Sequence, residues 1–546
     1  MCDNANRRES LIRTMDSLPP ENEYGNVEYK ARLINISDVR VKHLVTQMKW
    51  RLEEGKGEAI YEIGVEDDGS ISGLNDYELE QSLNTMKIMA SQLHAKLTII
   101  NEKEVNSGME RRRMIEILVE KEQYSDKLQE IRMAILGSAD AGKSTLCGVL
   151  SQGELDDGHG GARVNIFRYL HEFKTGKTSS ICLTALGFDE NGEMLSTKDD
   201  DKLTHNCKKI ITLIDLAGDK KYLKTTIYGI SGYRPNICCI VISGKGPTVI
   251  TKEHLGFVVA LNIPFFIVVT KIDSVNEEHL VKVIKSINNL LGFVSSDKTP
   301  VHITNETNAQ ELARDLYRGK AIIPIISVSL VSGRNLKILK RFIASLENRK
   351  VIQKINDIDP LFHVEEAFKI TGVGIVVCGS LYQGTLSEGD TICIGPSKDG
   401  SFSTAIIESI HRKKQPTRTI HGGETASLAI KIIKNGLITR SLIRKGMVLV
   451  GIHKNPRPCK RFSAKFFLLC HSTKYVCVGF QGTVYIGTVC QTVTIVDIKG
   501  DALRAGEWCI VTFEFYCSPE FITVGTPLIF REGKTKGMGE VIDICV

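Results

Sequence analysis

The stretch Gly137-Ser-Ala-Asp-Ala-Gly142-Lys143-Ser144 decides how the central part of this 546-residue chain folds. It fits the pattern G-x-x-x-x-G-K-[ST], with the apolar run Ile131-Arg-Met-Ala-Ile-Leu136 before it and Thr145-Leu-Cys-Gly-Val-Leu150 after it. These flanks predict a buried strand and the start of a helix, the setting that separates a phosphate-binding loop from an ordinary glycine turn. The backbone N–H groups and a lysine ammonium of such a loop face phosphate oxygens. We therefore expect Lys143 to contact phosphates and Ser144 to ligate Mg²⁺.

A second apolar run, Ile210-Ile-Thr-Leu-Ile, leads into the pattern D-x-x-G at Asp215-Leu-Ala-Gly218. Alone, this pattern carries almost no information. After a phosphate-binding loop and at the end of a strand, it predicts a carboxylate that holds a Mg²⁺-bound water and a glycine amide that binds the γ-phosphate.

A third apolar run, Phe265-Phe-Ile-Val-Val, is followed by Thr270-Lys271-Ile272-Asp273. The lysine stem is expected to stack on a base, and the carboxylate to accept hydrogen bonds from guanine N1–H and the 2-amino group. Adenine lacks these donors, so the pattern selects GTP over ATP. The usual first residue of this element is Asn, and we expect the shorter Thr270 to tether the phosphate loop less well.

The run Ile322-Ile-Pro-Ile-Ile-Ser-Val-Ser329 predicts a last strand, with Ser329 and the Leu330 amide placed to meet guanine O6. A register shifted by two residues would use Ser327 instead, and the sequence leaves both open. Between the phosphate loop and D-x-x-G lies a polar stretch, 171–180, without clear strand or helix periodicity. Its Thr178 is expected to close over the γ-phosphate and Mg²⁺ when GTP is bound. By its local pattern alone, this stretch is equally well an ordinary surface loop.

Together these elements predict a nucleotide site formed by Gly137, Ser138, Ala139, Asp140, Ala141, Gly142, Lys143, Ser144, Thr145, Asp215, Leu216, Ala217, Gly218, Thr270, Lys271, Ile272, Asp273, Ser329 and Leu330. The expected Mg²⁺ ligands are Ser144, Thr178 and, through water, Asp215.

The ordered set resembles the translational GTPases of the elongation factor Tu and elongation factor 1-alpha type. Within that group the chain is most similar to the branch of GTP-binding proteins 1 and 2. The resemblance covers most of the chain and is carried by segments 55–61, 140–146, 153–158, 176–180, 215–218, 221–226 and 251–256.

The resemblance implies that Thr178 is the switch threonine and that Asp140 helps to position phosphates or a monovalent cation. After Gly218, relatives carry a His that orients the attacking water, whereas this chain has Asp219. A carboxylate there can accept a hydrogen bond from water, but it repels the triphosphate and cannot act as a cationic donor. We therefore take Asp219 and Thr178 as the candidate catalytic residues and predict slow intrinsic hydrolysis.

Composition describes a soluble globular protein, with 42% hydrophobic and 25% charged residues. The net charge of +6 allows an RNA partner without indicating one. The 15 cysteines show no paired C-x-x-C spacing, so we expect reduced, mostly buried thiols. The first ten residues are polar and charged, so we expect no signal peptide there, and no apolar run reaches membrane-spanning length. We expect a cytoplasmic monomer that does not contact membranes.

The predicted fold is a multidomain α/β plus all-β chain. A small α/β extension (1–128) precedes a nucleotide-binding domain with a doubly wound, mostly parallel sheet (129–350). A hydrophilic insertion at 189–192 and 197–202 is expected to be a solvated hairpin or loop. Two β-barrels follow (351–455 and 456–546), because β-branched runs alternate with Gly turns there. A linker is expected at Asn455-Pro456-Arg-Pro458.

The leading hypothesis is a translational-type GTPase that uses GTP and Mg²⁺ to change its affinity for tRNA, mRNA or the ribosome. One alternative is a slowly hydrolysing, GTP-regulated adaptor in RNA turnover, which Asp219 favours. Another is the GTPase subunit that activates ATP sulfurylase, which shares the three-domain plan but fits residues 1–128 less well. Protein partners would dock on that extension, or the extension only stabilises the neighbouring domain.

Overall fold

The computed structural model of the chain describes residues 18–55, 57–93, 95–107, 110–121, 128–195, 207–295, 297–347, 358–434, 443–452, 456–471, 475–500 and 502–545. By their internal contacts the residues separate into two units, 1–124 and 125–546. Residues 197–202 of the predicted insertion, Asn455 of the predicted linker, and the domain boundary at residue 350 lie outside the described residues, whereas residues 189–192 form the turn between two antiparallel strands.

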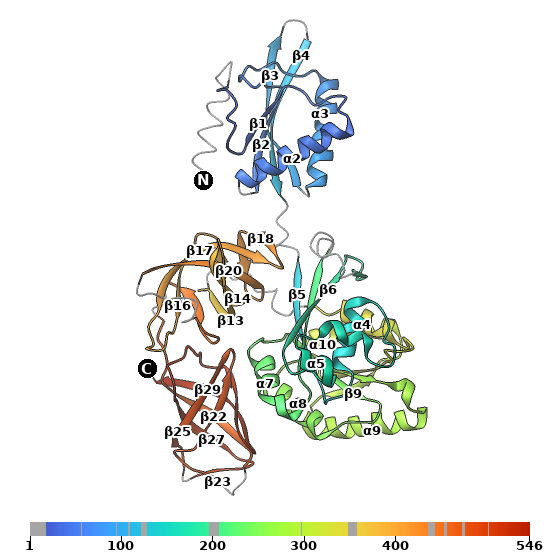
Figure 1. Cartoon of the computed structure of the whole chain (residues 1–546), viewed down its shortest axis with the longest axis vertical. Coiled ribbons are helices and arrows are strands. Elements are labelled where there is room, and N and C mark those ends of the chain that lie inside the picture. The colour runs from blue at the N-terminus through green and yellow to red at the C-terminus, as the bar shows by residue number, and fades with distance from the viewer. Residues whose placement is uncertain are drawn as a thin grey trace. The chain divides into compact units, whose positions relative to one another are not determined.

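In the first unit two helices pack against a four-stranded sheet (Figure 1). The strand order is β1-β2-β4-β3, with β1 parallel to β2 and the other pairs antiparallel. Ser37 caps helix α2, and Asn75 with Glu78 forms a capping box at the start of α3, which is why both helices begin there. The elements are β1 (Val27–Lys30), α2 (Asp38–Glu54), β2 (Glu58–Ile63), α3 (Asp76–Gln92), β3 (Ala95–Ser107) and β4 (Glu110–Lys121).

The second unit begins with an eight-stranded sheet of order β11-β12-β10-β9-β5-β8-β6-β7. All its pairs are parallel except those of β6 with β8 and with β7. The strands are β5 (Gln129–Leu136), β6 (Cys182–Phe188), β7 (Met194–Leu195), β8 (Lys209–Asp215), β9 (Ile237–Ser243), β10 (Phe265–Thr270), β11 (Thr299–His302) and β12 (Ile322–Ser327).

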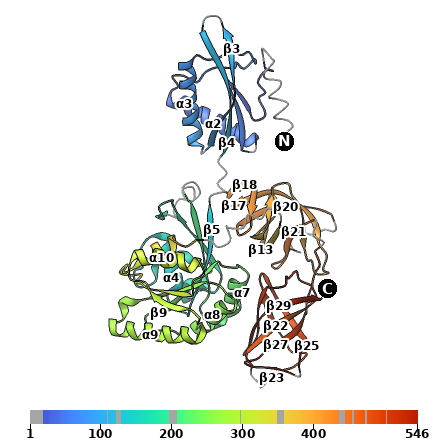
Figure 2. The ribbon, with the colours of Figure 1, turned by 180° about the vertical axis from the view of Figure 1, so that it is seen from behind.

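Helices cover both faces of this sheet, as Figure 2 also shows from behind. One core contains side chains of α4 (Lys143–Gln152), α10 (Glu306–Tyr317) and α11 (Leu336–Ala344). The core on the other face contains side chains of α7 (Leu223–Ser231), α8 (Val249–Ala260) and α9 (Glu277–Val294). The predicted doubly wound sheet is thereby confirmed. Shorter helices are η1 (Gly161–Ile166), α5 (Leu170–Thr175), η2 (Lys220–Tyr222) and η3 (Ile272–Ser274).

Two barrels follow, as predicted. In the first, strands β16-β21-β13-β14-β20-β17 close on themselves because β16 also pairs with β17. Its strands are β13 (Leu361–Ile370), β14 (Gly374–Gln383), β15 (Thr385–Ser387), β16 (Thr391–Gly395), β17 (Ser403–Arg412), β18 (Gln415–Thr417), β19 (Thr419–His421), β20 (Thr425–Lys434) and β21 (Val448–Gly451).

The second barrel closes in the order β22-β27-β25-β24-β28-β29. Burial alternates along β22, so every second side chain enters the barrel core. The strands are β22 (Arg461–Cys470), β23 (Tyr475–Val476), β24 (Gln481–Ile486), β25 (Val489–Ile498), β26 (Leu503–Arg504), β27 (Trp508–Phe515), β28 (Pro527–Glu532) and β29 (Thr535–Cys545).

Both barrels contact the nucleotide-domain sheet and its helices through buried groups. Arg132 of β5 donates two hydrogen bonds, of 2.6 and 2.8 Å, to the Glu365 carboxylate on β13, and each side chain is only 7% exposed. From the second barrel, Tyr485 and Ile529 belong to the apolar core that also contains α7, α8 and α9. The strand that leads into the phosphate loop is therefore joined directly to the first barrel.

The expectation of buried cysteines is confirmed for the five described cysteines of the nucleotide domain and is wrong for the second barrel. Although the described cysteines are free thiols, five of them are exposed, and all five belong to the second barrel or its loops: Cys470, Cys477, Cys490, Cys517 and Cys545. Cys470, Cys490 and Cys545 lie on barrel strands, which turn side chains alternately outward, and Cys477 and Cys517 lie in loops. Within the described ranges, no helix is both long and apolar enough to cross a membrane.

Candidate nucleotide site

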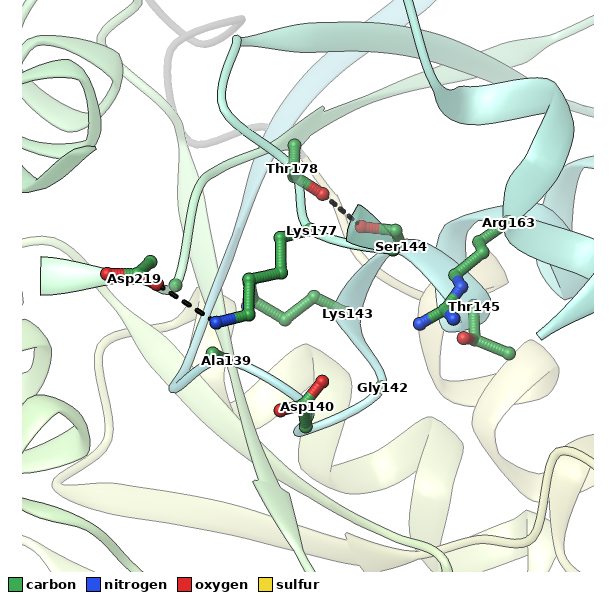
Figure 3. Close-up of a pocket in the computed structure, with 12 residues that line it drawn as sticks. Ala139, Asp140, Gly142, Lys143, Ser144, Thr145, Arg163, Lys177, Thr178 and Asp219 are labelled. Carbon is green, nitrogen blue, oxygen red and sulfur yellow. Dashed lines mark hydrogen bonds and ion pairs between the residues drawn. The ribbon is translucent and has the colours of Figure 1, made fainter. Parts of the chain in front are cut away.

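The parallel sheet brings the predicted loops to one edge. Strands β12, β10, β9, β5 and β8 are neighbours in that order, and the loops after four of them carry the sequence patterns. Ligands of such sheets bind at the carboxyl ends of the strands. A cavity at this edge is lined by Ala139, Asp140, Gly142, Lys143, Ser144, Thr145, Arg163, Gly176, Lys177, Thr178, Gly218 and Asp219 (Figure 3).

The loop between β5 and α4 has the backbone that phosphate binding needs. Gly137 has φ of 145°, and a Cβ at this position would lie 2.2 Å from the carbonyl oxygen of Val241. Asp140 and Gly142 also adopt positive φ, and helix α4 starts directly after Gly142. The helix amino terminus therefore faces the cavity with its unpaired N–H groups, as an anion site requires.

Lys143 is buried at the floor of this cavity, and its Nζ donates a 2.8 Å hydrogen bond to the carbonyl oxygen of Ser138. Burial lowers the pKa of Lys143, although Asp215 favours the charged form. Across the loop, the N–H of Gly137 donates to Nδ1 of the buried His254 of α8. Burial lowers the pKa of His254 to about 3, so a neutral imidazole holds the start of the loop.

The three expected metal ligands converge from three segments of the chain. The Ser144 hydroxyl lies 2.6 Å from the Asp215 carboxylate and 2.6 Å from the Thr178 hydroxyl, and Thr178 lies 3.4 Å from the same carboxylate oxygen. Burial raises the pKa of Asp215 to about 6, against the opposing effects of Lys143 and Ser144. The other oxygen of Asp215, Oδ1, is buried and without a hydrogen-bond partner among the described residues.

This donor set fits Mg²⁺. The ion prefers oxygen ligands and keeps several waters, and it is commonly held by one or two protein groups together with substrate phosphates. Two hydroxyls and a buried carboxylate with one unsatisfied oxygen meet that requirement beside the phosphate loop.

At the base end of the edge, Thr270 tethers the phosphate loop. Its hydroxyl is fully buried and donates a 2.6 Å hydrogen bond to the carbonyl oxygen of Ala141. An Asn amide has two N–H donors where Thr has one hydroxyl proton, so the tether is single. Lys271, which follows, has φ of 57° and is exposed, while Ile272 is buried.

The structure brings Ser329, and not Ser327, into contact with Asp273. The buried Ser329 hydroxyl donates to the carboxylate of Asp273. The Ser327 hydroxyl instead lies 3.1 Å from Nε2 of His302 on the edge strand β11. Leu330 is buried, and its carbonyl oxygen accepts from the Asp156 N–H.

The stretch before β6 differs from the sequence-based expectation, because residues Leu170–Thr175 form the short helix α5. Glu172 explains this local order. The residue is 1% exposed, and its carboxylate accepts hydrogen bonds from the N–H groups of Ser179 (2.7 Å), Ser180 (3.1 Å), Arg168 (2.9 Å) and Tyr169 (3.1 Å). Six residues are too few for helical periodicity to be visible in the sequence. The carboxylate therefore holds the segment that follows Thr178.

Five residues of the site were missed from the sequence: Arg163, Glu172, Gly176, Lys177 and His254. Arg163 and Lys177 line the cavity, one beside Thr145 and the other beside Thr178 (Figure 3). Only their position in the sequence could have indicated them, because each lies in a polar stretch between the phosphate loop and β8.

Asp219 caps the short helix η2, and its carboxylate accepts a hydrogen bond from the Lys221 N–H. That bond and the 3.3 Å contact of its other oxygen with Lys177 lower the pKa of Asp219. The residue that stands where relatives were expected to carry His is therefore an ionised carboxylate at the cavity wall.

The fold and these loops define a P-loop GTPase. The model of the elongation factor Tu GTP binding domain matches residues 129–361. Human GTP-binding protein 2 is 41% identical over 99% of this chain and 90% of its own length, and GTP-binding protein 1 of Xenopus laevis is 37% identical over 97% and 80%. The chain belongs to the translational GTPases, in the branch of GTP-binding proteins 1 and 2.

A solved structure agrees in fold. Translation elongation factor SelB from Methanococcus maripaludis, in complex with the GTP analogue GppNHp, superposes with a TM-score of 0.55 over 77% of this chain and 80% of that one, at 18% identity.

Proposed function

We propose that this protein is a molecular switch that binds GTP with Mg²⁺ and hydrolyses it slowly, and that couples the nucleotide state to an RNA or ribosome partner. The convergence of Ser144, Thr178 and Asp215 is the observation that carries this proposal. These groups come from the phosphate loop, the segment after α5 and the end of β8, so a single ion and the γ-phosphate would bind all three segments together.

Groups of the protein itself would bind the phosphates and select the base. Backbone N–H groups at the start of α4 and the Lys143 ammonium would bind the β- and γ-phosphates, and Asp273 would select guanine. Mg²⁺ supplies charge neutralisation of the phosphate oxygens. Loss of the γ-phosphate would remove the contacts that keep Thr178 beside Ser144, and the segment held by Glu172 would then move.

RNA and ribosome partners are proposed from the family. The names elongation factor Tu and translation elongation factor SelB describe relatives that act in translation. In this chain, the Arg132–Glu365 ion pair joins the strand of the phosphate loop to the first barrel, which gives a physical route from nucleotide to barrel.

A slow, GTP-regulated adaptor is the second candidate, and Asp219 favours it. An ionised carboxylate beside the γ-phosphate cannot donate a hydrogen bond to the attacking water. Such a protein would spend most of its time in the GTP state and act by assembling a complex. We infer cytoplasmic activity for either candidate.

Single-turnover hydrolysis of bound GTP, with and without ribosomes, tests the proposal and separates the two candidates. Lys143→Ala is the control without nucleotide binding. Strong stimulation by ribosomes supports the translational role. GTP binding with slow, unstimulated hydrolysis that Asp219→His accelerates supports the adaptor. Failure of the wild-type protein to bind GTP refutes both.

A further inference from the structure

Lys177 and Asp219 face each other at the wall of the nucleotide cavity. Lys177 Nζ lies 3.3 Å from Asp219 Oδ2, and both residues line the cavity (Figure 3). Lys177 belongs to the segment between α5 and β6, whereas Asp219 follows β8, so the pair joins the two loops expected to sense the γ-phosphate. None of the sequence patterns that define the family's nucleotide site assigns a role to Lys177.

The residue next to each partner of the ion pair contacts the phosphate loop. The neighbour of Lys177, Thr178, contacts the Ser144 hydroxyl at 2.6 Å. The neighbour of Asp219, Gly218, presses against the phosphate loop: a Cβ there would lie 2.3 Å from Lys143 Nζ, and its carbonyl oxygen accepts from the Ala139 N–H. The backbone at both ends of the ion pair is therefore fixed relative to the phosphate loop.

The Asp219 carboxylate has a fixed orientation, because one oxygen accepts the Lys221 N–H at 3.0 Å while the other faces Lys177. Lys177 is 46% exposed and Asp219 is 32% exposed. An ion pair this exposed contributes little to the stability of a fold. The geometry is better explained by a need to place an ammonium group at the cavity than by a need to hold the loops together.

We propose that Lys177 is a catalytic cation supplied within the chain, which contacts the γ-phosphate oxygens in the transition state of GTP hydrolysis, and that Asp219 is the positioning residue that directs it there. This inference rests on the proposed GTP hydrolysis at the same site. It assigns Asp219 a use other than that of the missing His, because the carboxylate acts on the lysine and not on the attacking water.

In the reaction, the oxygen of the attacking water forms a bond to the γ-phosphorus. The bond from the γ-phosphorus to the bridging oxygen breaks, and its electron pair stays on GDP. The proton of the water passes to the departing phosphate. Charge spreads over the γ-phosphate oxygens and the bridging oxygen, so an ammonium in contact with them lowers the barrier. Lys177 also offsets the repulsion between Asp219 and the triphosphate.

The test compares single-turnover hydrolysis rates with GTP affinities in the full-length protein. Lys177→Met keeps the length of the side chain and removes its charge, and we expect it to slow hydrolysis by about tenfold or more while changing the Kd for GTP much less. Lys177→Arg should retain most of the rate. The matched control is Lys174→Met, an exposed lysine of the same segment that does not line the cavity.

The positioning role is tested by a double-mutant cycle. Asp219→Asn should slow hydrolysis less than Lys177→Met does, and the double variant should be no slower than Lys177→Met alone, because Asp219 acts through the lysine. Additive losses, or faster hydrolysis in Asp219→His, would overturn the positioning role.

A wild-type rate in Lys177→Met would overturn the catalytic role of the lysine and leave the proposed GTPase function standing. A faster rate would also overturn it, because it would show that the ion pair slows hydrolysis. If the wild-type protein binds GTP but does not hydrolyse it under any condition, the proposed hydrolysis fails and the inference fails with it.

Discussion

The hydroxyl of Ser329 donates a hydrogen bond to the carboxylate of Asp273, and so joins the loop after β12 to the loop after β10. Ser329 is fully buried and Asp273 is exposed, which places the bond at the boundary between the sheet core and the base end of the site. A carboxylate oriented in this way is ready to accept two hydrogen bonds from one planar base.

The first prediction concerns the base. Asp273→Asn should weaken GTP binding by roughly 100-fold or more, because charge-assisted hydrogen bonds contribute about 1.5–3 kcal/mol each. In addition, the N–H₂ of the new amide would face an N–H donor of guanine. Xanthosine triphosphate, which carries a carbonyl where guanine has its amino group, should recover part of the affinity. Displacement of a fluorescent GDP analogue measures both, and unchanged GTP affinity would place the base elsewhere.

The second prediction decides the register of the last element. Ser329→Ala should weaken GTP binding by about tenfold, because it removes the hydroxyl that orients Asp273. Ser327→Ala is the matched control, since its hydroxyl contacts His302, and it should bind GTP like the wild type. The reverse order of affinities would show that the alternative register is correct.

Sequence patterns predicted the fold of the nucleotide domain well, because Lys143, Asp215 and Asp273 follow or end strands that the topology brings to one edge. Their roles in binding GTP stay predictions. The patterns failed where order depends on a single buried side chain. Helix α5 exists because Glu172 collects N–H groups from both sides of it, and that set forms only after the chain has folded. Lys177 was overlooked for the same reason, since its partner lies 42 residues away.

The third prediction concerns Glu172. Glu172→Gln leaves one oxygen to accept what two oxygens accept now, so N–H groups on one side of the carboxylate lose their partner. We expect trypsin to cleave faster after Lys177, and the affinity for GTP with Mg²⁺ to fall by about tenfold. The control is Glu154→Gln, an exposed residue after α4. Equal cleavage of both variants and the wild type would refute the role of Glu172.

The same carboxylate predicts a pH dependence. Burial alone would raise the pKa of Glu172, but the N–H donors of Ser179 and Arg168 outweigh it and lower the pKa from 4.5 to about 2. A depressed pKa stabilises the folded segment fully above the ordinary value. The stabilisation should decline as the pH falls below about 4.5 and be absent below about 2. Hydrogen exchange at the Ser179 and Ser180 amides, corrected for intrinsic rates, measures this, and protection that does not change over that range would contradict it.

The last prediction concerns the buried pair of Arg132 and Glu365. Glu365→Ala leaves a buried guanidinium without its carboxylate and should lower the free energy of unfolding by about 3–5 kcal/mol. The double variant Arg132→Met/Glu365→Leu should recover most of that loss, because two apolar side chains of similar volume remove the buried charge altogether. Thermal unfolding followed by fluorescence compares the three proteins. A double variant as unstable as the single one would show that the charges themselves are needed.

Strand β5 carries Arg132, and Gly137 of the phosphate loop follows directly after the strand, five residues from Arg132 and roughly 17 Å along an extended chain. An extended strand hydrogen-bonded on both sides is nearly inextensible, and here β8 and β9 flank it. A displacement of the first barrel at Glu365 would therefore displace the phosphate loop as well. The first barrel and the phosphate loop are attached to the two ends of one strand, so a force on the barrel and the binding of nucleotide would act on the same short element.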